Sequence, residues 1–376
     1  MRILLTVQGQ GRGHMTQAIA AAEVLEAAGH ELVGVVAGNH PGRDLPAFFV
    51  DSFRAPVTML PSAGFIFAKD RGVDLPRTLL HAGRHIGTWR ESLNRLHAVV
   101  EVTQPDLVIN FFEPLVGILQ ATRALPVPVL SVAHQFALLG PAWGAPAATP
   151  TAPWWLRAFI RLVGFRSWKM ALSFTPHAAR SISPDRVIVA PPLLRRRIRS
   201  LAPKEGDYIL VYVATHGYAE LVRSWHRAHP EVRFHCFYDR PGAPKVEVVD
   251  QNLSFHALDG EEFVRLMAGC RAVMCTAGFE SVCEAAFLGK AVLMVPLEHH
   301  HEQRLNALDA ERAGVAVSHP LFDLDALALL PKWVDNEWFR AWCCQADAKL
   351  LETVEWVAGR RVPGAAALGP LQPTAD

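Results

Sequence analysis

The segment from residue 271 to residue 307 restricts the possible folds of this chain more than any other. It contains a short apolar run, a turn at Gly278, a run with helical spacing, and a second apolar run at 291–295 that stops at Pro296. Apolar strands that alternate with helices are typical of parallel sheets covered on both faces. The segment therefore predicts an α/β fold in which a polar loop follows the second strand.

The turn at Gly278 also has the composition of an anion-binding site. Because Gly278 carries no side chain, the unpaired N–H groups and the dipole of the following helix can approach a diphosphate. Glu284 lies about one turn into this helix, where a carboxylate can accept hydrogen bonds from both hydroxyl groups of a ribose. A glycine turn alone is more often an ordinary structural turn, so the nucleotide interpretation depends on the combination with Glu284.

Length and composition limit the class of protein. A chain of 376 residues exceeds what one core usually serves, which predicts two domains. The net charge of +1 argues against nucleic-acid binding, and no apolar stretch is long enough to span a bilayer. The apolar run at 1–7 is too short for a secretory signal. Six cysteines without a Cys-x-x-Cys pair predict reduced thiols, not disulfides or a zinc site. We therefore expect a cytoplasmic protein.

The order of the segments predicts the domain organisation. The stiff pair Pro191-Pro192 marks the end of a first domain at 1–198, and a second runs over 199–335. Residues 336–358 are expected to form one helix that crosses back to the first domain. The Ala-, Gly- and Pro-rich residues 359–376 are expected to be disordered.

The N-terminal segment begins as a βαβ unit but departs from the dinucleotide-binding pattern. An apolar strand at 3–7 leads into a loop with glycine at every second position, and a helical run and a second strand follow. His14 stands where that pattern requires its last glycine, and the second strand ends in Gly38-Asn39 instead of an acid. NAD binding is therefore not expected, and no other cofactor is predicted.

Two motifs in the second half resemble the donor-binding half of GT-B glycosyltransferases. Gly278-Phe279-Glu280-Ser281 followed by Glu284 is similar to the Gly-Trp-Asn-Ser pattern and ribose-binding Glu of plant UDP-sugar glycosyltransferases. Glu302-Gln303-Arg304-Leu305-Asn306-Ala307 resembles the Gln-Gln-x-x-Asn-Ala loop with which the bacterial undecaprenyl-linked N-acetylglucosaminyltransferases hold the donor sugar. Thr276 stands where the plant enzymes have a histidine, and the loop at 296–302 is longer than theirs, so the sugar is not identified.

The resemblance implies a fold and two sets of binding residues. It implies two Rossmann-like doubly wound domains that face a cleft, with the acceptor on the first domain and a UDP-sugar on the second. The expected donor-binding residues are Thr215, His216, Gly217, Phe255, Thr276, Ala277, Gly278, Phe279, Glu280, Ser281, Glu284, Glu302, Gln303 and Asn306. The expected acceptor-binding residues are Gly11, Arg12, Gly13, His134 and Gln135.

The resemblance also implies a general base. His14 matches the catalytic histidine of the plant enzymes, and an imidazole can accept a proton from a hydroxyl near neutral pH. A lone histidine at a helix start is more often a structural residue. The plant histidine is oriented by an aspartate, whose position here is Asn110. Either Asn110 orients His14 without a charge, or Glu113 takes the carboxylate role, and His134 is a further candidate base.

A basic and aromatic segment predicts a possible membrane contact. Residues 154–169 combine tryptophan and phenylalanine with arginine and lysine, as in segments that bind anionic bilayer surfaces. A packed helix with solvated arginine tips is an alternative, because the basic positions do not share one helical face. If the segment binds lipid, the protein would be peripheral on the inner face of the membrane.

Together these features predict an inverting, metal-independent hexosyltransferase that moves a sugar from a UDP-sugar to a hydroxyl acceptor, either lipid-linked or a small molecule. A UDP-sugar 2-epimerase is an alternative that shares the architecture but needs no acceptor. A second alternative is a nucleotide-sugar-binding protein without turnover.

Overall fold

The computed structural model describes residues 1–40, 44–64, 75–139, 152–176, 186–213, 216–238, 244–298, 300–331 and 334–359. These residues form two compact units. Unit 1 holds Met1–Gly64, Pro76–Arg195 and the chain from Trp342 onward, and unit 2 is built mainly from Arg196–Ala341.

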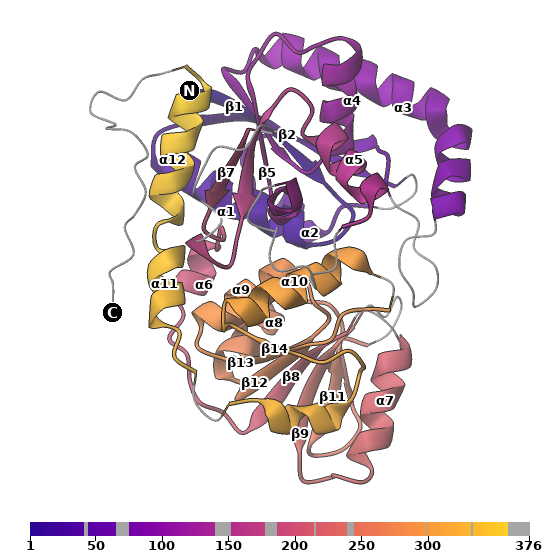
Figure 1. Cartoon of the computed structure of the whole chain (residues 1–376), viewed down its shortest axis with the longest axis vertical. Helices are drawn as coiled ribbons and strands as arrows, with labels where there is room; N and C mark the ends of the chain where they lie inside the picture. The colour runs from indigo at the N-terminus through magenta and orange to yellow at the C-terminus, as the bar shows by residue number, and fades with distance from the viewer. Residues whose placement is uncertain are drawn as a thin grey trace. The chain divides into compact units, whose positions relative to one another are not determined.

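The described strands of unit 1 form one seven-stranded sheet in the order β3-β2-β1-β4-β5-β6-β7 (Figure 1). Every described pairing in it is parallel. The central strands are buried except for Arg2 at the start of β1, as expected for a parallel sheet with helices on both faces. The strands are β1 (Arg2–Gln8), β2 (Glu31–Asn39), β3 (Val57–Pro61), β4 (Leu107–Phe111), β5 (Val129–Ala133), β6 (Trp168–Leu172) and β7 (Val187–Ala190).

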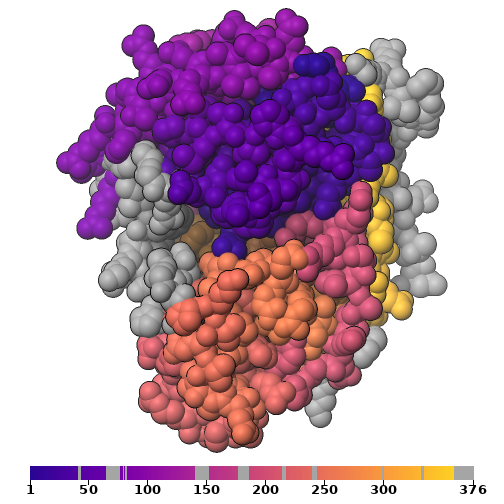
Figure 2. All heavy atoms as spheres, turned by 180° about the vertical axis from the view of Figure 1, so that it is seen from behind, coloured from indigo at the N-terminus to yellow at the C-terminus, as the bar shows by residue number. Residues whose placement is uncertain are grey.

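Helices connect these strands as in a doubly wound fold. The long helix α3, purple in Figure 2, forms an outer edge of unit 1 and exposes Leu80 and Ile86. The last helix of the chain packs on α1, and its Leu350 and Val354 are fully buried. The helices of this unit are α1 (Gly13–Ala27), α2 (Ala47–Val50), α3 (Leu75–Thr103), α4 (Pro114–Thr122), η1 (His134–Leu139), α5 (Trp154–Val163) and α12 (Ala346–Val357).

Unit 2 contains a second sheet, with its described strands in the order β10-β11-β9-β8-β12-β13-β14. β10 pairs antiparallel with β11, and the other described pairings are parallel. The strands are β8 (Tyr208–Tyr212), β9 (Arg233–Phe237), β10 (Val246–Val248), β11 (Leu253–His256), β12 (Ala272–Cys275), β13 (Ala291–Met294) and β14 (Val317–Ser318). The helices are α6 (Arg196–Ser200), α7 (His216–His226), α8 (Gly260–Gly269), α9 (Phe279–Phe287), α10 (His301–Arg312), η4 (Leu324–Leu329) and α11 (Glu337–Cys343).

The α/β doubly wound class predicted from the sequence is confirmed, and two local predictions are wrong. The single helix expected over 336–358 is two helices, α11 and α12, with a break at Cys344 and Gln345. The polar loop expected over 302–307 lies in α10, because Leu305, Asn306 and Ala310 form a buried face and the His300 side chain caps the first turn. The predicted disordered tail lies outside the described residues, apart from its first residue, Gly359.

Candidate functional site

Two switch points in strand order define where ligands would bind. In unit 1 the strands that follow β1 are added on one side of it and the strands that follow β4 on the other side, so the order reverses between β1 and β4. In unit 2 the order reverses in the same way between β8 and β12. Open α/β sheets bind ligands beside the carboxyl ends of the two strands at such a point. The predicted site residues His14, Glu113 and Gly278 follow β1, β4 and β12 directly.

The glycine-rich loop after β1 is shaped by close backbone contacts. The Gly9 N–H donates to the Gly38 carbonyl at 2.6 Å, and a Cβ on Gly9 would lie 2.8 Å from that oxygen. Gly11 has a φ of +90°, which side-chain-bearing residues rarely adopt. Arg12 is the N-cap residue of α1, with its guanidinium carbon 5.3 Å from the centre of the Phe48 ring, and Gly13 is the first helical residue.

His14 lies in the first turn of α1 with its ring held from several sides. Its Nδ1 lies 3.3 Å from Gln17 Oε1, and its Nε2 lies 3.4 Å from Gln135 Nε2. The Phe112 ring stacks on it with the centroids 5.2 Å apart. Burial lowers the pKa of His14 to about 4, which outweighs the opposite effect of Gln17. The imidazole is therefore neutral at neutral pH.

Neither the Asn110 nor the Glu113 side chain hydrogen bonds to the His14 imidazole, so neither orients it by direct contact. Asn110 points into a buried polar cluster, where its Oδ1 accepts from Thr6 Oγ1 at 2.9 Å and its Nδ2 donates to the Val163 carbonyl at 3.3 Å. Its Oδ1 also accepts the Glu113 N–H at 2.9 Å, which closes the turn after β4.

That turn gives Asn110 an indirect role. Phe112, inside it, has a φ of 60°, a left-handed conformation that costs free energy for a bulky residue. Because the Phe112 ring stacks on His14, Asn110 acts on His14 through the shape of the backbone.

Glu113 is fully buried at the start of α4. Its Oε1 accepts hydrogen bonds from Ser62 Oγ and, at 3.0 Å, from the Leu115 N–H. Its Oε2 has no hydrogen-bond partner in the described part of the chain, and a Cβ on Gly38 would overlap it. Burial raises the pKa of Glu113 to about 7, against the opposing effect of both hydrogen bonds. Near neutral pH much of this carboxyl group is therefore protonated.

The two residues after β5 have different surroundings. Both lie at the start of η1. His134 Nδ1 lies 2.7 Å from the Leu172 carbonyl, and its ring meets Phe174 edge-on. Gln135 reaches His14, so only the second residue of the pair contacts the predicted base.

In unit 2 the helix α9 begins at a glycine. Gly278 is its N-cap residue and has no side chain with which to cap the helix. Unpaired N–H groups at such an end attract negative charge. Glu280 and Glu284 are buried, at 8% and 4% exposure, while Ser281 is half-buried with its Oγ 3.5 Å from the Gly278 carbonyl. Phe279 is also buried.

The predicted sugar-binding residues of α10 hold the neighbouring loops. Asn306 Nδ2 donates to the Ala277 carbonyl at 3.0 Å, directly after Thr276 at the end of β12. Gln303 Oε1 accepts the Leu297 N–H at 2.8 Å. α10 therefore fixes the shape of the loops that follow β12 and β13. Glu302 is half-buried in its first turn.

Phe255 is not at the switch point. It is fully buried in the apolar core of unit 2, with the Arg223 guanidinium carbon 4.2 Å from its ring centre. Alternation along β11 directs the Phe255 side chain into the core, and the donor contact of this residue stays a prediction. Thr215 and the His216 side chain lie outside the described residues, and Gly217 lies in the first turn of α7.

Sequence reasoning missed three residues of unit 1: Gln17, Phe112 and Ser62. The spacing of three between His14 and Gln17 was a usable signal, since residues three apart are neighbours on a helix. The left-handed φ of Phe112 and the hydrogen bond from Ser62 to Glu113 could not be predicted, because no local sequence pattern indicates either of them.

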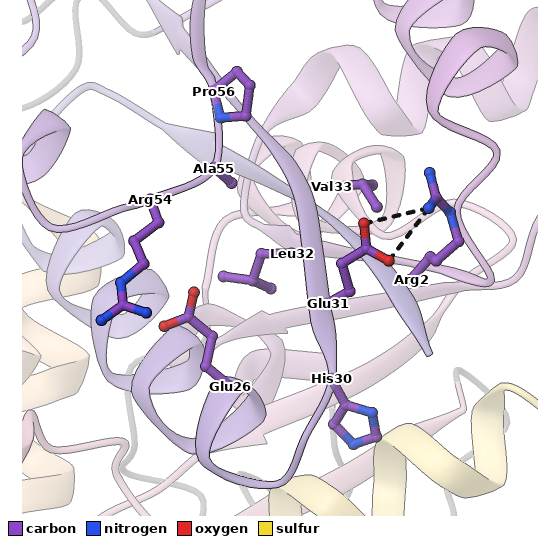
Figure 3. A pocket seen from close by; sticks show the side chains of 9 residues that line it. All are labelled: Arg2, Glu26, His30, Glu31, Leu32, Val33, Arg54, Ala55 and Pro56. Atoms are coloured by element: carbon purple, nitrogen blue, oxygen red, sulfur yellow. Dashed lines mark hydrogen bonds and ion pairs between the residues drawn. The ribbon is translucent and has the colours of Figure 1, made fainter.

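A hollow of about 540 Å³ lies at the opposite edge of the sheet of unit 1 (Figure 3). It is lined by residues from the amino ends of β1 and β2, including Arg2 and Glu31, whose side chains pair at 3.2 Å. Glu26 and Arg54 point toward one another across it (Figure 3). Ligands of open α/β sheets bind at the carboxyl ends, so this hollow is separate from the candidate site.

No described helix is long and apolar enough to cross a membrane. Within the same residues, no group of three or more His, Cys, Asp or Glu side chains is arranged to hold a metal ion.

Comparison with known proteins gives a consistent family. An uncharacterized glycosyltransferase of Methanosarcina acetivorans is 25% identical over 338 residues, which cover 84% of this chain and 82% of that protein. UGT2 of Phytolacca americana, solved with UDP-2fluoro-glucose and pterostilbene, has a TM-score of 0.63 at 14% identity, covering 95% of this chain and 99% of that one. MurG of Acinetobacter baumannii has a TM-score of 0.53 at 17% identity, covering 96% and 100%. The shared fold is that of the GT-B glycosyltransferases, as predicted. The family model described as Glycosyl transferase family 1 matches residues 1–333, and the chain therefore belongs to this family.

Proposed function

We propose that this glycosyltransferase moves a hexose from a UDP-sugar to a hydroxyl acceptor, with inversion at the anomeric carbon. The observation that carries the proposal is the pair of switch points, one with a buried neutral imidazole and the other with an uncapped helix N-terminus. An imidazole can take a proton, and a helix N-terminus can hold a diphosphate. Two groups suited to the two halves of the reaction are thus present.

The donor would bind unit 2. The diphosphate would lie at the start of α9, beside Gly278, and the Glu284 carboxylate would accept the ribose hydroxyls. UGT2 of Phytolacca americana was solved with a UDP-sugar analogue, and UGT89C1 of Arabidopsis thaliana was solved with UDP and with UDP-L-rhamnose. These relatives support a uridine nucleotide as the first donor to test.

The acceptor would bind unit 1, beside His14, Arg12 and Gln135. His14 would take the proton of the acceptor hydroxyl, whose oxygen forms the new bond to the anomeric carbon. The bond between that carbon and the diphosphate oxygen breaks, and UDP leaves with the electron pair. The N–H groups of α9 would stabilise the charge that develops on the diphosphate. The proton on the imidazole is finally released to water.

Incubation with UDP-glucose or UDP-N-acetylglucosamine and a panel of hydroxyl acceptors tests this function. We expect a glycosylated acceptor by mass spectrometry, with the anomeric configuration inverted by NMR and the rate unchanged by EDTA. Saturating UDP should also raise the melting temperature, and ligand at about 100 times its Kd corresponds to roughly 2.7 kcal/mol. A changed UDP-sugar without acceptor would identify an epimerase, and no thermal shift with any UDP compound would overturn the donor assignment.

We further propose that unit 1 binds anionic membranes from the cytoplasmic side. α5 and the residues after it expose apolar and basic side chains together: Trp154 is 80% exposed, Phe165 is 39% exposed, and Arg161 and Arg166 are exposed beside them. Such a surface suits the interface of an anionic bilayer. A lipid-linked acceptor would then be presented to the same unit.

Vesicle flotation tests the membrane proposal. The protein should float with vesicles that contain phosphatidylglycerol and not with pure phosphatidylcholine, and high salt should weaken the binding. Trp154→Ser should reduce flotation, while Trp338→Ser, at a partly exposed tryptophan of unit 2, serves as the matched control. Equal binding to neutral and anionic vesicles would show that α5 is only a packed helix.

A further inference from the structure

Amide side chains, and not a carboxylate, meet both ring nitrogens of His14. Gln17 lies three residues further along α1 and is 2% exposed, with its Oε1 3.3 Å from Nδ1. Gln135 is the second residue after β5 and is 7% exposed, with its Nε2 3.4 Å from the other ring nitrogen.

The chemistry of these amides selects one tautomer of the ring. An amide oxygen can only accept a hydrogen bond, and an amide nitrogen can only donate one. With the two amides oriented as they are in the structure, Nδ1 faces the oxygen of Gln17 and carries the ring hydrogen, and Nε2 faces the nitrogen of Gln135 and presents its lone pair. Both contacts agree, so the basic atom of His14 is Nε2.

The plane of the ring is fixed separately. Phe112 stacks on it with an interplanar angle of 19° and meets Phe136 and Phe159 edge-on. The stacking restricts the tilt of the imidazole ring. The partners at its two nitrogens therefore decide which nitrogen is basic.

We propose that Gln17 is the positioning residue of His14, fixing the tautomer with the lone pair on Nε2, and that the Gln135 amide occupies the place an acceptor hydroxyl takes. This inference rests on the proposed function, in which His14 removes the hydroxyl proton. When the acceptor hydroxyl replaces the Gln135 N–H, the hydroxyl proton moves to Nε2 of His14. The Nδ1–H of His14 stays hydrogen-bonded to Gln17 Oε1. The following bond changes are those given above.

An amide partner also has a consequence for base strength. A carboxylate at the same place would stabilise the imidazolium by charge, whereas a neutral amide leaves burial as the stronger effect. Replacing Gln17 by glutamate should therefore make His14 a stronger base without moving it.

NMR of protein labelled with ¹⁵N-histidine tests the tautomer without any substrate. The ¹⁵N shifts distinguish a protonated ring nitrogen from one with a lone pair, and His14→Gln assigns the signals. At pH 7 we expect a hydrogen on Nδ1 and a lone pair on Nε2. The reverse tautomer, or a fast mixture of both, would overturn the proposal.

Two variants of Gln17 extend the test. Gln17→Glu should raise the midpoint of the His14 titration by about 1–3 pH units, the usual effect of an adjacent opposite charge. Gln17→Met should let the ring populate both tautomers. Gln120→Met is the matched control, since Gln120 on α4 is also buried and its Oε1 also accepts a hydrogen bond, in this case from the backbone N–H of Leu125. It should leave the His14 signals unchanged. If Gln17→Met does not fold, the wild-type tautomer and the Gln17→Glu titration decide the matter.

Kinetics separate this inference from the proposed function. The acid limb of the kcat profile should move to higher pH in Gln17→Glu, with the KM for the donor unchanged. If no UDP-sugar reacts with any acceptor, the proposed function is wrong. The NMR experiment still tests the tautomer of His14, because it needs no substrate. If transfer occurs but the acid limb does not move, Gln17 is a structural residue only.

Discussion

Burial controls the charge of two titratable side chains at the switch point of unit 1. It lowers the pKa of His14 to about 4 and raises the pKa of Glu113 to about 7. The first group is therefore neutral at pH 7, and the second is about half protonated. A weakly charged site of this kind suits a neutral hydroxyl acceptor better than an ionic one.

Glu113→Gln should change how stability depends on pH. The folded pKa of about 7 exceeds the ordinary 4.5, so the native state holds a proton that the unfolded state releases between these values. The contribution of Glu113 is thus complete below pH ~4.5 and lost as the pH rises through 7. The free energy of unfolding of Glu113→Gln, relative to wild type, should increase by roughly 2–3 kcal/mol from pH 5 to pH 8. Urea denaturation at both values measures this, and Glu91→Gln, on the exposed side of α3, is the control. A parallel pH profile for both proteins would contradict the raised pKa.

Glu284→Gln should weaken UDP binding without unfolding the protein. The substitution keeps the shape of a side chain that is only 4% exposed but removes the charge that strengthens bonds to ribose hydroxyls. A loss of about 1.5–3 kcal/mol is expected, or roughly 10- to 150-fold in Kd by calorimetry. The melting temperature without UDP checks the fold. Unchanged affinity would make Glu284 a structural residue of α9.

Among the secondary-structure elements, α5 is joined to α4 by a contact at backbone level. Gly117 on α4 lies so close to the Leu162 carbonyl that a Cβ there would overlap it. The next carbonyl, of Val163, accepts from Asn110. The position of α5 is therefore linked to the turn that presents Phe112 to His14.

Gly117→Ala should destabilise unit 1, because the new methyl group forces α4 and α5 apart. Overpacking of this kind typically costs about 1–3 kcal/mol. Gly83→Ala on α3 is the matched control, since nothing lies within 4 Å of its Cβ position. There, the better helix propensity of alanine should stabilise the protein by up to about 1 kcal/mol. Chemical denaturation compares the two, and equal effects would show that α4 and α5 separate easily.

The sequence predicted the elements better than their contacts. Apolar runs and glycine turns identified β1, β4, β12 and α9, since buried parallel strands are apolar throughout. The loop at 302–307 was misread because its polar residues form one face of a helix whose other face is buried. Asn110 was placed on the right strand, but which side chains meet His14 depends on a left-handed turn that no local pattern encodes.

For the whole molecule, the proposed function assigns donor binding to unit 2 alone. Hydrogen exchange by mass spectrometry should therefore show that UDP slows exchange in peptides from β12, α9 and the start of α10. These peptides contain the N–H groups at the start of α9 and the hydrogen bond from Asn306 to the Ala277 carbonyl. Peptides of β1 and α1 should be unchanged, and cytidine monophosphate is the control ligand. Slower exchange confined to α1 would show that the nucleotide binds unit 1, and would contradict the assignment of the donor to unit 2.

Unit 1 is not continuous in the chain, because α12 returns to it after all of unit 2. Trp342 donates to the Ser173 carbonyl at 3.0 Å, and Trp356 lies 4.2 Å from Trp168 between ring centroids. During synthesis the helix that packs on α1 is therefore made after unit 2. Unit 2 can be complete on the ribosome while unit 1 still exposes the apolar surface that Leu350 and Val354 will bury. Unit 1, whose translation starts first, therefore cannot bury this surface until α12 has been made.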